Sequence, residues 1–149
     1  MPRPRKKRSV YCPPFFSDFK PAGIRGSKLE SLWLALDEFE AIRLADFLGM
    51  DHAEAADQMD ISRSTFSRLA ERARYKMAQF LIEGRHLRID GGDVHFRGNL
   101  IRCQSCQHMF NSAFDLALEK CPSCGSSNLM DMANAYGHGD CCLNYHHRK

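Results

Sequence analysis

The sequence predicts two parts, a mainly α-helical helix-turn-helix domain followed by a small β unit held together by a metal ion. Three observations support this fold class. Apolar residues recur with helical spacing between residues 36 and 84, a short polar bend lies near residue 60, and two C-x2-C pairs follow. We expect a basic extended arm over residues 1–25, the helix-turn-helix domain over 26–90, the metal-binding β unit over 91–136 and a Cys/His-containing tail over 137–149.

The N-terminal arm is expected because residues 1–25 hold five of the six prolines and few periodic apolar positions. The formal charge of +3 conceals an asymmetry, since residues 29–60 carry nine acidic side chains and one basic residue, Arg43. A basic block of this kind indicates either contacts with a polyanion or a solvated tail, and both interpretations stay open. The candidate DNA contacts of the arm are Arg3, Arg5, Lys6, Lys7 and Arg8.

Two short helices are expected next. Asp37 with Glu40 marks the start of the first helix, Gly49 marks its end, and Asp51 with Glu54 marks the start of the second. The first helix should bury a broad apolar stripe made of Phe39, Ile42, Leu44, Ala45 and either Phe47 or Leu48.

A third helix should begin after the bend at Asp60 and Ile61, with the Ser62 hydroxyl as its N-cap and Gly84 as its end. The weak alternation and paired glycines of "RHLRIDGGDVHFRGN" then predict a strand and a linker. At 100° per residue, one side of the third helix is apolar and should be core: Phe66, Leu69, Ala70, Ala73 and Met77, continued by Phe80 and Leu81.

The opposite side of this helix is polar and basic at its N-terminal end, as a helix that enters the major groove of DNA requires. We expect Ser64, Ser67 and Arg68 to contact base edges. Arg63, Thr65 and Arg72 lie at the flanks, where phosphates would be. Glu71 either accepts a hydrogen bond from a cytosine amino group or holds Arg68 or Tyr75 in place, and the second role is favoured. The competing interpretation is an α-hairpin with a solvated basic face.

The tract "LDEFEAIRLADFLGMDHAEAADQMDISRSTFSRLAERARYKM" resembles region four of bacterial sigma factors, which is unrelated to the winged helix. Together with the opening "MPRPRKKR", with "FKPAG" and with "LRIDGG", it also resembles a family of small prokaryotic DNA-binding proteins catalogued as a domain of unknown function. This resemblance covers about residues 1–92. It implies a helix-turn-helix fold and a regulatory role on DNA, and it implies no target sequence.

Four cysteines, Cys103, Cys106, Cys121 and Cys124, form the two C-x2-C pairs. Two such pairs supply the four soft ligands of a closed tetrahedral site, so we expect one structural zinc ion per chain, and the arrangement resembles a zinc ribbon. Iron at the same site and redox disulfides are the alternatives. The flanking segments "IRC", "HMFN" and "SSNLMDM" are strand candidates.

The tail "GHGDCCLNYHHRK" contains further candidate ligands, and Cys12 is expected only to pack. A second metal site, a redox-sensing pair and a mobile tail with incidental thiols stay open as interpretations. The residues concerned are His138, Cys141, Cys142, His146 and His147.

These patterns predict a sequence-specific protein that binds double-stranded DNA, a transcriptional regulator with a structural zinc ribbon. The alternatives are a metal- or redox-responsive sensor that uses its cysteines to control DNA binding, and an RNA-binding or RNA-polymerase-associated adaptor. We expect no enzyme, because no carboxylate pair, nucleophile setting or phosphate-binding glycine loop is evident. RNA polymerase and a second copy of the chain are candidate partners.

No apolar run approaches the roughly 20 residues that cross a bilayer, and the basic N-terminus lacks a signal-peptide core. A cytoplasmic, nucleoid-associated location without membrane contact is therefore expected. The sequence leaves open the operator, the regulated genes, the sign of regulation and the oligomeric state.

Overall fold

The computed structural model describes residues 7–116 and 119–147, with side chains as far as residue 144. The chain divides into two compact units. The first unit contains Phe16–Val94 and the chain up to Val10, whereas the second contains Tyr11–Phe15 and the chain from His95 onward. No helix in the described residues has the length and apolar character needed to cross a membrane.

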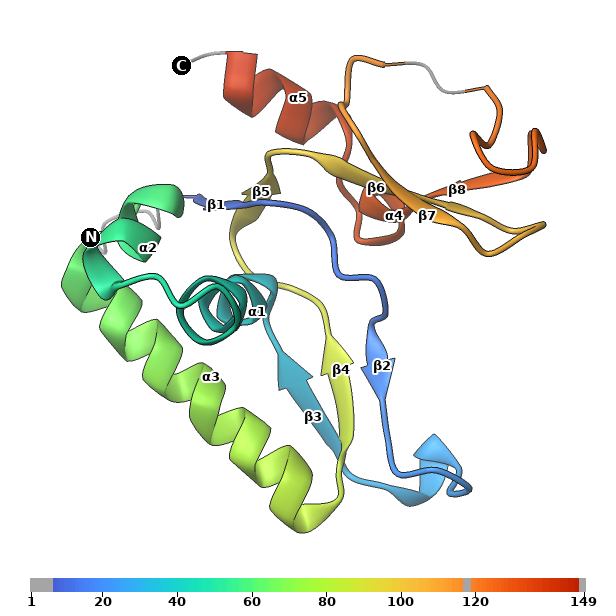
Figure 1. Ribbon diagram of the computed structural model, residues 1–149. Helices are drawn as coiled ribbons and strands as arrows, with labels where there is room; N and C mark the ends of the chain where they lie inside the picture. Colours follow the sequence, from blue (N-terminus) through green and yellow to red (C-terminus); the bar gives the residue numbers. More distant parts are fainter. Residues whose placement is uncertain (1–6, 117–118, 148–149) are drawn as a thin grey trace. The chain divides into compact units, whose positions relative to one another are not determined.

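The helices of the first unit surround the long helix α3 (Figure 1). They are α1 (Leu36–Ile42), the π-helical turn η2 (Arg43–Phe47), α2 (His52–Gln58) and α3 (Arg63–Glu83). Both α1 and α2 pack against α3. Their shared core consists of Ala41, Leu44, Ala55, Ala56, Met59, Phe66, Leu69 and Ala70.

Side chains at the helix ends satisfy backbone groups that the helices leave unpaired. The Asp51 carboxylate accepts from the Glu54 N–H at 2.8 Å, and the Ser62 hydroxyl accepts from the Thr65 N–H at 3.2 Å. Both predicted caps are therefore confirmed. Gly84 ends α3 with a φ of +64°, a left-handed conformation that glycine adopts without steric cost.

The first helix differs from its prediction at its start, while Gly49, its predicted end, follows the helical turn η2 with a left-handed φ of +70°. It begins at Leu36, and the Glu38 carboxylate accepts from the backbone N–H of Ala35, so Asp37 is not the cap. Phe47, expected in the core, is 81% exposed. The buried face instead includes Glu38 and Glu40, whose charges are balanced by cations rather than water.

A three-stranded sheet completes the first unit. It consists of β2 (Asp18–Phe19), β3 (Ser31–Leu34) and β4 (His86–Ile89) in the order β2-β4-β3. Strands β3 and β4 are parallel, with Ser31 opposite His86, while β2 and β4 are antiparallel. The crossover from β3 to β4 contains all the helices of this unit. The strand β1 (Arg8–Val10) and the 3₁₀ turn η1 (Gly26–Lys28) lie in the N-terminal part.

The second unit is built on a three-stranded antiparallel sheet in the order β7-β6-β8. Its strands are β6 (Asn99–Cys103), β7 (Met109–Ser112) and β8 (Leu129–Asp131), followed by α4 (Met132–Ala135) and α5 (Asp140–His147). The strand β5 (Val94–Phe96) enters this unit at His95. The buried Asn99 side chain accepts from the Leu100 and Ala133 N–H groups, which joins β6 to α4.

The prediction of a mainly α-helical helix-turn-helix domain followed by a small β unit is wrong as a fold class. The protein has a mixed α and β fold, with three small sheets distributed along the chain. The reason is that β3 and β4 contain only four residues each. The strand predicted within residues 85–99 is present as β4, but β3 lies within the segment assigned to the helical domain, and so short an alternation carries little periodic signal.

We predict that Leu69→Ala lowers the free energy of unfolding by about 2–5 kcal/mol, since the Leu69 side chain is fully buried and its loss leaves a cavity. Leu81→Ala on the same helix is the matched control. Leu81, expected in the core from the sequence, is 73% exposed, so its removal should change stability by no more than about 0.5 kcal/mol. Chemical denaturation of both variants measures the difference, and equal losses would contradict the assigned core face.

Candidate nucleic-acid interface and metal centre

The segment between α2 and α3 is a tight turn. Its conformation depends on Asp60, whose φ of +58° lies in the left-handed region that aspartate tolerates better than most residues. The backbone N–H of Ile61 donates to the carbonyl of Ala56 at 3.0 Å, which closes the turn over the end of α2. Helix α2 is thereby held across the N-terminal end of α3, and the first turns of α3 are left with one open face.

That open face carries four of the six predicted DNA contacts on this helix. Arg63, Ser64, Arg68 and Arg72 are exposed, and among the described residues none of the three arginines forms a salt bridge. The other two contacts are already engaged within the protein. The Ser67 hydroxyl lies 2.7 Å from His52 Nδ1, and the Thr65 hydroxyl accepts from the Ser62 hydroxyl at 2.8 Å.

Two other basic residues of α3 hold the helix against the acidic segment before it. The Arg74 guanidinium donates to both carboxylate oxygens of Asp46, at 2.8–3.2 Å. The Lys76 ammonium lies 2.7 Å from the buried Glu38 carboxylate. The basic tract of α3 therefore divides by position, because its early arginines face outward and its later cations anchor the helix.

A groove of about 640 Å³ runs beside the exposed face and contains charges of both signs. Arg68 and Arg72 line it from α3, and Asp37 and Glu38 line it from α1. Asp37 pairs with Arg8 at 2.7 Å, and Glu38 pairs with Lys76. Glu71 and Asp93 also line the groove, so it presents carboxylates beside its arginines.

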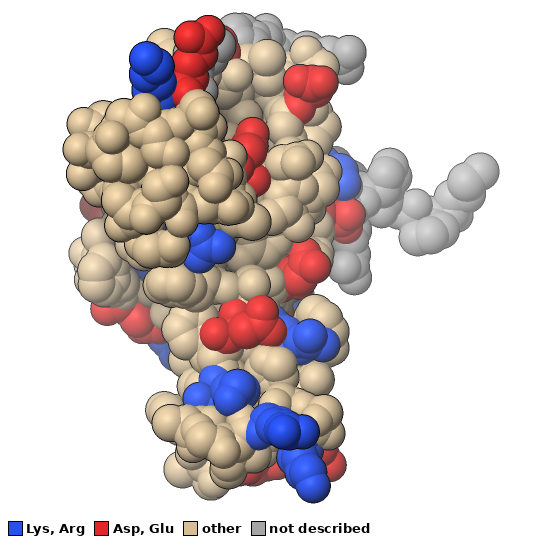
Figure 2. All heavy atoms as spheres, turned by 90° about the vertical axis from the view of Figure 1, so that its right-hand side faces the viewer, with Lys and Arg blue, Asp and Glu red and all other residues tan. Residues whose placement is uncertain are grey.

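The predicted arm contacts fall into two groups. Lys7 lies 3.4 Å from Asp93, and Arg8 pairs with Asp37, so these two residues are tied to the first unit. Arg3, Arg5 and Lys6 lie outside the described residues. Figure 2 shows one face of the molecule, on which most of the surface is uncharged, acidic side chains are scattered, and several basic side chains lie together at the lower end.

The four predicted metal ligands of the second unit come together. One ligand sulfur from each of Cys103, Cys106, Cys121 and Cys124 lies within 4.8 Å of the others. Cys103 Sγ lies 3.5 Å from Cys124 Sγ, and Cys106 Sγ lies 3.7 Å from Cys121 Sγ. Sulfurs bound to zinc at about 2.3 Å in a tetrahedron are about 3.8 Å apart, so the cluster is compatible with a metal ion of this size.

The two cysteine pairs have the same backbone geometry. Gln107 donates its N–H to the Cys103 carbonyl, as Gly125 does to the Cys121 carbonyl, both at 2.9 Å. Gln107 and Gly125 have left-handed φ values of +66° and +77°. The first pair thus adopts the turn of the second without a glycine, a strain that glutamine accepts less readily.

The four thiols cannot all carry a negative charge without a cation. The pKa of the Cys103 thiol is lowered to about 6, and the largest cause is a hydrogen bond from the backbone N–H of Cys106. A backbone hydrogen bond from Ser126 is the largest single cause acting on the pKa of Cys124, and it lowers that pKa. The neighbouring Cys103 and Cys106, together with burial, outweigh this hydrogen bond and raise the pKa of Cys124 to about 12. A divalent cation would favour all four thiolates, so the donor set is compatible with metal binding.

The structure also gathers part of the tail. His138, Cys141 and Cys142 lie together with His95, a residue that the sequence analysis did not single out. No spacing rule could have found His95, because it is 43 residues from His138 and lies on β5. The side chains of His146 and His147 lie outside the described residues.

Comparison with known proteins identifies relatives across most of the chain. The family model described as "Protein of unknown function DUF134" matches residues 1–97. A UPF0251 protein of Chloroherpeton thalassium is 46% identical over 132 residues, which cover 89% of this chain and 87% of the relative. A UPF0251 protein of Pelotomaculum thermopropionicum is 44% identical over 126 residues, covering 85% of this chain and 95% of the relative. No solved structure matches the chain.

We predict that Cys121→Ser removes the metal from the four-cysteine cluster, because three thiolates and a hydroxyl bind zinc more weakly than four thiolates. Residues 99–131 should then exchange their amide hydrogens faster, since metal binding contributes to the folding of so small a unit. Elemental analysis and hydrogen exchange measure the two effects. The helical signal of α3 should remain as in the parent protein, and a full metal complement in the variant would refute the assignment.

Proposed function

Since the chain belongs to the DUF134 family, whose relatives carry the name UPF0251 and no stated activity, we propose from the site itself that it binds double-stranded DNA. In this proposal α2, the turn at Met59–Ser62 and α3 act as a helix-turn-helix motif of the kind found in region four of sigma factors. The motif is embedded in a mixed α and β unit. Sequence-specific binding would make the protein a transcriptional regulator.

One observation carries the proposal, the division of α3 into a buried and an exposed face at its N-terminal end. Phe66 and Leu69 are fully buried, while Arg68 and Arg72 are exposed on the same two turns. A major groove about 12 Å wide admits a helix that presents such a face. Arg68 has the reach for bidentate bonds to guanine, and Ser64 is exposed one turn before it.

Phosphate contacts would set the orientation of the motif on the duplex. Arg63 and Arg72 flank the exposed face, and neither is engaged by a carboxylate in the described residues. Ser67 takes a different role from its predicted base contact in this proposal. Its bond to His52 fixes α2 against α3, and it reaches DNA only if that bond opens.

We propose zinc as the metal of the four-cysteine cluster, in a structural role, with the surrounding sheet as a zinc ribbon. Support comes from the all-thiolate donor set, which leaves no position for a substrate. Iron is the alternative occupant, because it accepts the same ligands. RNA polymerase and a second copy of the chain are proposed partners of the protein, and the cytoplasmic nucleoid is its proposed location.

The general test is selection of bound sites from random DNA duplexes, followed by competition with structured RNA. Enrichment of a defined sequence, with RNA a poor competitor, would support the proposal. A palindromic site would add that a dimer binds. No enrichment, or stronger binding to RNA, would replace it with the adaptor function.

We predict that Arg68→Ala weakens binding to the selected site by about 1–3 kcal/mol and relaxes specificity at one base pair. Thermal stability should be unchanged because the side chain is exposed and forms no salt bridge among the described residues. Arg25→Ala removes the same charge from an exposed position of the same unit and is the matched control. Gel-shift titrations of the two variants compare them, and an equal small loss in both would count against base readout by Arg68.

We predict that deletion of residues 2–6, which removes Arg3, Arg5 and Lys6, weakens binding to all duplexes to a similar degree. The slope of log affinity against log salt should flatten by up to about 3, at about 0.9 per phosphate contact. Lys7 and Arg8 are retained because their ion pairs belong to the fold. An unchanged slope would show that the arm does not contact DNA.

A further inference from the structure

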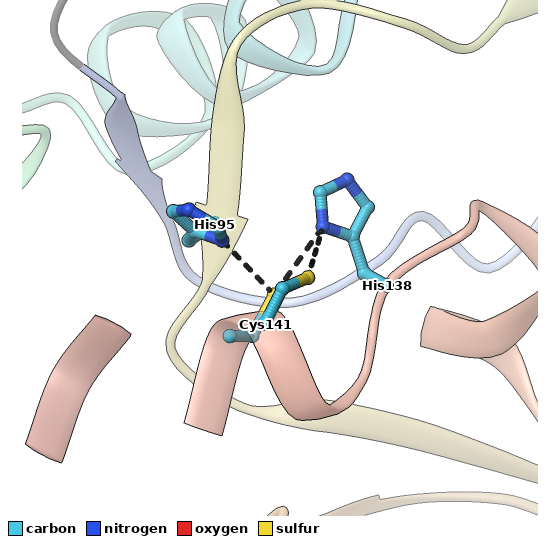
Figure 3. Close-up of side chains that lie close together, drawn as sticks. His95, His138 and Cys141 are labelled. Atoms are coloured by element: carbon cyan, nitrogen blue, oxygen red, sulfur yellow. Dashed lines mark hydrogen bonds between the residues drawn. The ribbon is translucent and has the colours of Figure 1, made fainter. Parts of the chain in front are cut away.

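A second cluster of metal-ligand side chains lies in the second unit, apart from the four-cysteine cluster. It contains His95 on β5, His138 in the loop before α5, and Cys141 and Cys142 in the first turn of α5. One nitrogen or sulfur atom from each residue lies within 4.8 Å of the others. Figure 3 shows His95, His138 and Cys141 pointing toward a common centre from these separate segments.

The distances within the cluster match a tetrahedral zinc site. Zinc–sulfur bonds of about 2.3 Å and zinc–nitrogen bonds of about 2.0–2.1 Å place sulfurs about 3.8 Å apart, and sulfur and nitrogen about 3.6 Å apart. The two sulfurs are 3.9 Å apart. His138 Nδ1 lies 3.4 Å from both sulfurs, and His95 Nδ1 lies 3.7 Å from Cys142 Sγ.

Hydrogen bonds account for this arrangement only if most of them are donated to Cys142 Sγ, which is a weak acceptor. A thiol has one proton, yet Cys142 Sγ is approached by Cys141 Sγ, His95 Nδ1 and His138 Nδ1. Its proton can serve only one of these neighbours. A cation at the centre satisfies all of them at once, because each then acts as a lone-pair donor.

A backbone donor is directed at the sulfur of Cys142. Its side chain is fully buried, and the backbone N–H of Phe96 donates to its sulfur at 3.2 Å. A hydrogen bond of this kind to a ligand sulfur orients it and stabilises its negative charge. The position of both cysteines in the first turn of an eight-residue helix adds the favourable end of the helix dipole.

The local backbone explains how neighbouring cysteines serve one ion. Gly137 takes a φ of +77°, and the His138 N–H donates to the Ala133 carbonyl at 2.9 Å, which turns the chain back over α4. The Cys142 N–H then donates to the Gly139 carbonyl at 3.0 Å as α5 begins. His138 is thereby placed beside both sulfurs, and β5 supplies the fourth ligand.

We propose that His95, His138, Cys141 and Cys142 form a second zinc site, which fastens α5 to β5. Two imidazoles and two thiolates are a donor set that zinc accepts in closed structural sites. The ion joins segments more than 40 residues apart, so its binding energy contributes to the folding of the C-terminal part of this unit. This assignment does not depend on DNA binding.

The experiment counts metal in the full chain purified under reducing conditions. The parent protein should contain two zinc ions per chain, and Cys141→Ser and His138→Ala should each contain one. Cys141 is exposed, so its replacement by serine disturbs packing little. Cys12→Ser removes a thiol that belongs to neither cluster and should retain two ions. Hydrogen exchange should rise in residues 140–144 of Cys141→Ser and stay unchanged in residues 99–131.

Several outcomes would overturn the proposal. One zinc ion per chain in the parent protein, unchanged by Cys141→Ser, leaves the second cluster without a metal. A mass lower by two hydrogens before reduction, together with one zinc ion, indicates a disulfide between Cys141 and Cys142. Another metal at this position, found by the same elemental analysis, contradicts the assignment of zinc. Two zinc ions per chain in Cys141→Ser would also overturn the proposal, whatever the metal content of Cys121→Ser.

Discussion

The burial of one side of α3 is the constraint on which the first unit depends. Phe66, Leu69, Ala70 and Ala73 have almost no exposed surface, and α1 and α2 both pack against this helix. The rotation of α3 about its own axis is thereby set by apolar contacts. Arg68 then points away from this core, and Arg63 and Arg72 lie at the flanks of the exposed face. The core of the unit thus sets the direction of the surface that is proposed to bind DNA.

The sequence predicted best the features that repeat or that depend on neighbouring residues. The caps at Asp51 and Ser62 and the end at Gly84 involve contacts over three or four residues, and all three are present. The two C-x2-C pairs can also be recognised from neighbouring residues. Their spacing predicted a cluster of four cysteines, and the fold brings these four residues together.

Features that depend on distant parts of the chain were missed. The parallel pairing of β3 with β4 joins segments more than 50 residues apart, and neither strand has enough residues for a clear alternation. The burial of Glu38 and Glu40 was not predicted, and Lys76, the cation beside Glu38, lies 38 residues away in the chain. His95 was overlooked for the same reason, since nothing near it in the sequence indicates a ligand.

The placement of Tyr11–Phe15 in the second unit has a consequence for synthesis of the chain. The Gly98 N–H donates to the Tyr11 carbonyl at 2.8 Å. This segment therefore cannot form its contacts in the second unit until residues more than 80 positions later have been synthesised. At a translation rate of about 5–20 residues per second, the delay between Phe15 and His95 is about 4–16 s. All residues of the first unit are therefore synthesised while Tyr11–Phe15 still lack the rest of the second unit. A fragment that starts at His95 would likewise lack a piece of its own fold.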